Sequence, residues 1–150
     1  MADAATDSPS AARLALCEHS DRRGTVDGAW WPPDYLLRDA LLDLVSVMSL
    51  TLGAVRRVLY DPSLFPSAPS RVIRANSAIS VDQYSLVDRD TIYVMGTHAR
   101  NALLYVVPPD TAADRAADLL GKVAGTAYPV SVGMLRAMAT GRLRAGGEIG

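Results

Sequence analysis

The segment at residues 24–34 constrains the fold of this chain more than any other stretch. It contains both tryptophans, two glycines around an aspartate and a double proline, and it runs directly into a predicted amphipathic helix. The pattern predicts an extended path over residues 25–31, interrupted at Gly28. Neighbouring side chains of an extended segment point to opposite faces. Trp30 and Trp31 are therefore predicted to differ sharply in burial.

A helix is predicted over residues 34–52. Its apolar side chains recur at steps of three and four, which places them on one stripe. Asp34 is the predicted N-cap and Gly53 the predicted C′ residue. Polar residues line the far side, so the helix is expected to be amphipathic and to pack on a sheet. The buried stripe is predicted to contain Leu37, Leu41, Leu44, Met48 and Leu52.

Short strands separated by polar turns make up most of the remaining chain. We expect strands over residues 13–19, 55–60, 71–75, 78–86, 90–95 and 102–107, and helices over 112–124 and 132–139. Consecutive strands predict an α+β fold whose sheet is mainly an antiparallel meander of about five to seven strands. A single domain is expected over residues 12–140, between a disordered tail at 1–11 and a flexible tail at 141–150.

Residues 103–107 are apolar on both faces of the expected strand. Such a strand is usually covered on both sides, because soluble proteins rarely expose large apolar patches. The long helix can cover one side only. The second side needs either the C-terminal helices or a second subunit, so the chain is expected to form a homodimer or to use its own C-terminal helix.

Composition limits the classes of function. The net charge of −1 argues against a general nucleic-acid binder. No apolar run approaches the roughly 20 residues that span a bilayer. Cys17 is the only cysteine, which rules out an internal disulfide and, with an acidic N-terminus, favours the cytoplasm. Lys122 is the only lysine among 15 basic residues, a usage that favours a GC-rich, actinobacterial genome.

The run Val26-Asp27-Gly28-Ala29-Trp30-Trp31-Pro32, the helix that follows it and the later Val106-Val107-Pro108-Pro109 resemble an actinobacterial family of unknown function with the motif VDGAWWP. The resemblance covers residues 12–124 and implies a cytosolic single domain of α+β type. It implies no catalytic residue, ligand or cofactor. The chain departs from the family pattern over residues 71–89, where a glycine-rich strand pair is expected.

Three residues of this motif are candidates for binding a ligand or partner, namely Asp27, Trp30 and Trp31. The alternative for the tryptophans is packing, since buried aromatic side chains mostly serve that purpose. The alternative for Asp27 is to hold a turn through nearby backbone N–H groups, because Asp-Gly is a common turn pair.

Other chemistries find little support. Cys17 and His19 share one strand face, where their Cβ atoms lie about 6 to 7 Å apart, too far for a nucleophile–base pair. No closely spaced ligand pair indicates a metal, and Gly121-Lys122 lacks the remaining residues of a phosphate-binding loop. No metal site and no cofactor are therefore predicted.

Four arginines form a basic patch if their strands pair, and an acidic partner is one use for such a patch. The alternative is a solvated face balanced by Asp61, Asp82 and Asp88, and the net charge favours it. The four residues are Arg56, Arg57, Arg71 and Arg74.

These observations favour a non-enzymatic domain that acts through protein–protein or self association. The alternative is a small-molecule-binding domain or an enzyme without a recognisable motif. Its pocket would lie between helix 34–52 and the sheet, with Asp27, Trp30 or Trp31 at the mouth.

Overall fold

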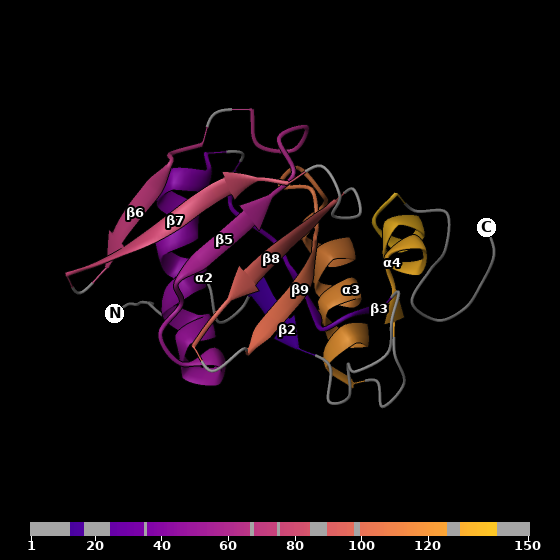
Figure 1. Cartoon of the computed structure of the whole chain (residues 1–150). Coiled ribbons are helices and arrows are strands. Elements are labelled where there is room, and N and C mark those ends of the chain that lie inside the picture. The colour runs from indigo at the N-terminus through magenta and orange to yellow at the C-terminus, as the bar shows by residue number, and fades with distance from the viewer. Residues whose placement is uncertain are drawn as a thin grey trace, which may run out of the picture.

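A computed structural model describes residues 13–16, 25–34, 36–66, 68–74, 76–84, 90–97, 100–125 and 130–140. The fold is α+β, with three helices among these residues: α2 (Leu37–Leu52), α3 (Ala113–Gly125) and α4 (Val132–Ala139) (Figure 1). The strands are β2 (Leu14–Leu16), β3 (Thr25–Val26), β4 (Gly28–Trp30), β5 (Arg57–Tyr60), β6 (Arg71–Arg74), β7 (Ser77–Gln83), β8 (Thr91–Met95), β9 (Asn101–Val106) and β10 (Val130–Ser131).

Seven strands form one mixed sheet in the order β2-β4-β9-β8-β5-β7-β6, and β3 pairs with β10 in a separate ladder. The predicted meander is wrong, because β4 runs parallel to β9 and β5 runs parallel to β7. Hairpin neighbours do pair, as β6 with β7 and β8 with β9. However, β5 inserts between β7 and β8, so consecutive strands along the chain are not always neighbours in the sheet.

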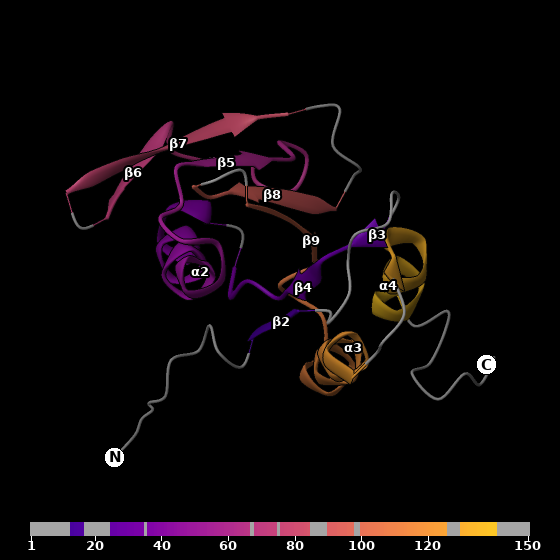
Figure 2. The ribbon, with the colours of Figure 1, turned by 60° about the horizontal axis from the view of Figure 1, so that its bottom comes forward.

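The sheet bends around α2, and α3 and α4 lie on the opposite side, near β2, β3 and β4 (Figure 2). Two apolar clusters result. The first joins α2 to the side chains of β5 to β9 that point toward it, including Val58, Ile92 and Leu104. The second joins α3 and α4 to Tyr105 and Val107 on the other face.

These two clusters settle how the doubly apolar strand is covered. Leu104 and Val106 belong to the α2 cluster, whereas Tyr105 and Val107 are buried under α3 and α4. The branch of the prediction that assigns the second face to the C-terminal helices is confirmed. A second subunit is not needed to bury Tyr105 or Val107.

Helix α2 confirms the predicted buried stripe, since Leu37, Leu41, Leu44, Met48 and Leu52 are all buried. It ends as predicted at Gly53, whose φ of 75° suits glycine. Its start differs from the prediction. The N-cap residue is Leu36, and the Asp34 carboxylate accepts a hydrogen bond from the Leu36 N–H in a local turn before the helix.

The outer side of α2 is not the polar face that the sequence predicts. Leu50 is 86% exposed and Leu42 is 38% exposed, so apolar side chains face water beside Asp43 and Ser46. The helix therefore lacks a clean division into an apolar and a polar half. Within the described residues, no helix is both long and apolar enough to cross a membrane.

Candidate functional site

The two tryptophans lie on opposite faces of the sheet. Trp30 is 1% exposed and belongs to the α2 cluster, where its ring stacks on Phe65 with centroids 6.3 Å apart. Trp31 is half-buried and packs against the α3 and α4 cluster. The predicted difference in burial is confirmed. The two indoles do not line one common site.

Trp31 connects the start of β2 to the chain that follows β9. Its indole N–H donates to the carbonyl oxygen of Pro109 at 3.3 Å. The Arg13 guanidinium lies 4.1 Å from the ring centroid, within the range of a cation–π contact. The same guanidinium donates to the Trp31 carbonyl oxygen, and the Trp31 N–H donates to the Arg13 carbonyl oxygen. One face of the indole is therefore already occupied by Arg13.

Asp27 lies between β3 and β4, where it interrupts the extended segment one residue before the predicted position. Its N–H donates to the Leu103 carbonyl oxygen at 2.7 Å, and its carboxylate accepts from the Leu103 N–H at 2.6 Å. The sequence places the partners of this carboxylate in a local turn. The structure places the partner on β9, 76 residues away along the chain. Asp27 thus joins two strands through hydrogen bonds to backbone.

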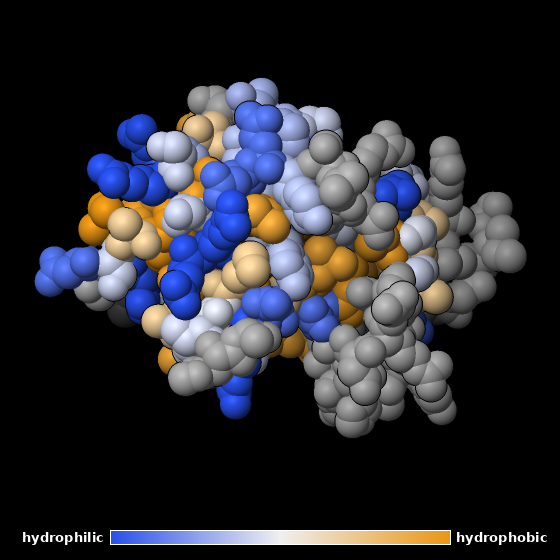
Figure 3. All heavy atoms as spheres, viewed as in Figure 1, coloured by the Kyte–Doolittle hydropathy of each residue, from blue (hydrophilic) through white to orange (hydrophobic). Residues whose placement is uncertain are grey.

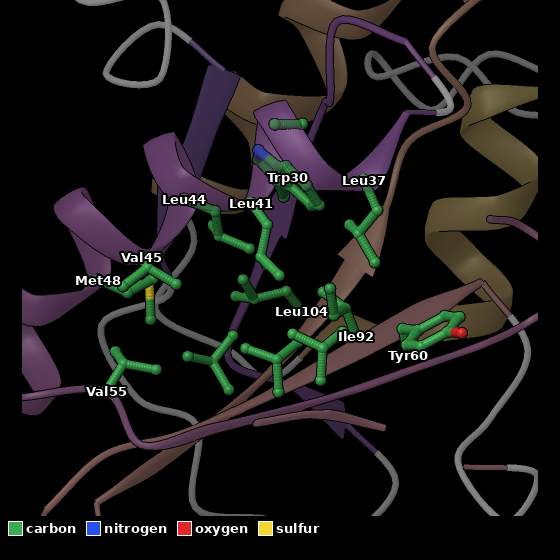
Figure 4. Close-up of a cluster of buried hydrophobic side chains, with 14 of the residues drawn as sticks. Trp30, Leu37, Leu41, Leu44, Val45, Met48, Val55, Tyr60, Ile92 and Leu104 are labelled. Atoms are coloured by element: carbon green, nitrogen blue, oxygen red, sulfur yellow. The ribbon is translucent and has the colours of Figure 1, made fainter. Parts of the chain in front are cut away.

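The space between α2 and the sheet is filled with apolar side chains (Figure 4). Leu37, Leu41, Leu44 and Ile92 are fully buried there, together with Trp30. This interface is the place where the sequence predicts a pocket. Its packing places Trp30 in the core of the domain, and Trp31 and Asp27 make their contacts elsewhere.

A polar cluster without a signal in the sequence lies where β5 ends and β8 begins. The buried Asp61 accepts hydrogen bonds from Ser63 and from the N–H of Asp90. Asp90 has a positive φ of 66° and accepts from the Arg136 guanidinium of α4 at 2.6 Å. Burial raises the pKa of the nearby Tyr105 phenol, and the Asp90 carboxylate raises this pKa further, while Arg136 lowers it.

This cluster anchors α4 on the sheet. The ion pair between Arg136 and Asp90 is partly exposed, at 38% and 27% of the side-chain areas, so its contribution to stability is modest. Its geometry nevertheless fixes the helix that buries Tyr105. No sequence signal identifies it, because its members come from separate segments of the chain.

The outer face is the surface that β5 to β8 direct away from α2. Alternate residues of these strands are buried against α2, so their neighbours point the other way. Polar residues lie between apolar patches on this side of the molecule (Figure 3). The outer face consists of Arg57, Leu59, Arg71, Ile73, Ala78, Ser80, Asp82, Tyr93 and Met95.

The four arginines are divided by the sheet. Arg57 and Arg71 lie on the outer face, both opposite Ser80 of the strand between them. Arg57 forms an ion pair with Asp82 at 2.9 Å, whereas Arg74 points toward α2 and donates to the Ser46 hydroxyl. Arg57 and Arg71 are therefore the two arginines that share a surface, and β7 lies between their strands.

A sequence model described as a family of unknown function (DUF5994) matches residues 13–123. The chain belongs to the DUF5994 family. The matched region agrees with the extent of the resemblance seen in the sequence, and it runs from β2 almost to the end of α3. In this DUF5994 chain, β10 and α4 lie after the matched region. No curated protein and no solved structure matches the DUF5994 chain.

The described part of the DUF5994 chain contains no group of three or more His, Cys, Asp or Glu side chains arranged to hold a metal ion. Cys17, His19 and His98 lie outside the described residues. The outer face is the candidate functional site, because it brings together half-buried aromatic and apolar side chains, the exposed Ile73 and two exposed arginines.

Proposed function

We propose that this DUF5994 chain is a protein-binding domain that acts without catalysis, through the outer face of its sheet. The covered strand β9 needs no second subunit, so the proposal favours a different protein as the partner. Self-association remains a distinct outcome of the test below. Cytoplasmic location and actinobacterial origin belong to the same proposal and rest on the single cysteine and the near absence of lysine.

The composition of the outer face supports this function. Leu59 pairs directly with Tyr93 across β5 and β8, and Met95 lies opposite Arg57. Protein interfaces are enriched in tyrosine, methionine and arginine relative to other surfaces. Ile73 is 58% exposed on the adjoining strand β6. The apolar pair of Leu59 and Tyr93 thus lies beside the ion pair of Arg57 with Asp82. This arrangement resembles the apolar core and polar rim of a non-obligate interface.

A photo-crosslinking amino acid at position 93 tests the proposal in cells that produce the chain. We expect p-benzoylphenylalanine in place of Tyr93 to give one discrete adduct with another protein. The same amino acid in place of Asp118, an exposed residue of α3, is the matched control and should give none. Equal adducts from both positions, or none from position 93, would contradict the proposal. An adduct of twice the chain mass indicates self-association.

A second variant ties the adduct to this surface. Leu59→Glu places a charge beside position 93, because these residues are direct cross-strand neighbours. We expect the adduct from position 93 to disappear in this variant while the circular dichroism spectrum is unchanged. An adduct that survives Leu59→Glu would show that the cross-link does not report binding at the outer face.

A further inference from the structure

The free edge of the sheet at β6 presents a defined set of backbone groups. β6 is the last strand in the sheet order, and among the described residues no strand pairs with its outer edge. The Val81 N–H donates to the Ser70 carbonyl oxygen. Bonding alternates along an antiparallel pair, so Val72 and Arg74 also bond toward β7. The N–H and C=O groups of Arg71 and Ile73 therefore point away from the sheet.

The side chains of the same two residues lie together on the outer face. Ile73 is 58% exposed, and Arg71 is exposed and has no ion-pair partner among the described residues. Arg57, its neighbour on the same rung, is already paired with Asp82. The edge thus combines free hydrogen-bonding groups, an apolar side chain and an uncompensated positive charge.

These charges disfavour a second copy of the chain as the occupant of this edge. A two-fold axis that pairs β6 with β6 places the Arg71 side chains of both copies on the same face of the joined sheet. Like charges across neighbouring strands are destabilising, and charged side chains on edge strands are a common protection against self-pairing. A partner strand that carries negative charge is instead attracted to Arg71.

We propose that β6 binds an extended acidic segment of a partner protein by antiparallel strand addition, which rests on the protein-binding function proposed above. In the antiparallel direction, the partner residue opposite Ile73 precedes the one opposite Arg71 by two positions. The segment therefore carries an apolar residue followed two positions later by Asp or Glu. Its backbone bonds to Arg71 and Ile73, as in other cases of strand addition.

The probe is a synthetic peptide in which valine and glutamate alternate at the positions facing Ile73 and Arg71, and the matched control replaces each glutamate with lysine. We expect the acidic peptide to slow hydrogen exchange of the Arg71 and Ile73 amides, measured by NMR. The Val72 and Arg74 amides already bond to β7, so their exchange should change little. Uniform protection of all four amides, or none, contradicts strand addition at this edge.

Charge reversal tests the acidic preference. Arg71→Glu exchanges attraction for repulsion, so we expect about five- to tenfold weaker binding of the acidic peptide and tighter binding of the lysine peptide. Ile73→Pro removes an N–H that points away from β7, a substitution that edge strands tolerate. It should abolish binding of both peptides while the circular dichroism spectrum and the β6–β7 amide protection are retained.

The outcomes separate this inference from the broader function. Equal binding of both peptides at β6 overturns the acidic preference and leaves strand addition standing. Binding of neither peptide overturns the inference at β6, whereas the adduct from position 93 still supports a protein-binding outer face. Loss of that adduct, together with peptide binding at β6, overturns the outer-face proposal instead.

Discussion

Gly28→Ala is expected to destabilise the protein because β2 passes too close to β4 for a side chain. A Cβ atom at Gly28 would lie 2.2 Å from the Ala15 carbonyl oxygen and 2.9 Å from Cδ2 of Leu16. Ordinary contact distances require β2 to move by about 1 Å or more. β2 is only three residues long, and each of them pairs with β4. The displacement therefore disturbs the whole ladder.

The expected loss follows from two contributions. Overpacking costs about 1 to 3 kcal/mol, and one lost strand hydrogen bond costs about 1 kcal/mol. The free energy of unfolding should therefore fall by about 2 to 4 kcal/mol. At about 2 to 4 °C per kcal/mol for a domain of this size, calorimetry should show a Tm lower by about 4 to 16 °C.

Gly121→Ala is the matched control, since a Cβ atom there meets no atom within 4 Å apart from its chain neighbours and the backbone of its own helix. Alanine is favoured over glycine inside a helix by about 0.5 to 1 kcal/mol, so this variant should melt higher than the wild type. The same substitution thus shifts the Tm in opposite directions at the two sites. A Gly28→Ala protein that melts at or above the wild-type temperature refutes the close approach of β2 and β4.

Two further predictions concern the core. Leu41→Ala should lower the free energy of unfolding by about 2 to 5 kcal/mol, because this side chain is fully buried. Leu50→Ala should change it by no more than about 0.5 kcal/mol, because Leu50 is exposed. Equal losses for the two variants in urea unfolding would contradict the orientation of α2. Because burial and Asp90 raise the pKa of Tyr105, the unfolded chain loses this proton first. The protonated Tyr105 phenol therefore makes its full contribution to the free energy of unfolding below its ordinary pKa of 10.0. Above pH 10.0 this contribution is lost, by about 1.4 kcal/mol per pH unit. Tyr105→Phe should remove that slope, and an unchanged alkaline slope would contradict it.

The positions of most helices and strands follow from the sequence alone. Helix α4 has the predicted bounds, and the end of α2 at Gly53 is set by a residue that accepts a positive φ. These features depend on periodicity and on one or two neighbouring residues, which the sequence displays directly. The contrast between Trp30 and Trp31 belongs to the same class, because an extended backbone alternates its side chains.

The candidate site was only partly predictable. The sequence grouped Arg57 and Arg71 with two other arginines as one candidate basic patch, but it favoured a solvated face and did not predict which of the four share a surface. Asp90 and Arg136 gave no signal at all, since a contact between segments 46 residues apart leaves no local pattern. Asp27 showed its need for backbone partners, while the identity of the partner depended on β9.

The sequence determined which segments become helices and strands and which side chains must be buried, because local backbone preferences and hydrophobic periodicity act over a few residues. Only the tertiary structure decided that β5 lies between β7 and β8, that β4 runs parallel to β9, and that α3 and α4 cover Tyr105. Strand neighbours are chosen by the burial of both sheet faces at once. That choice depends on all the packed elements together, so no single segment encodes it.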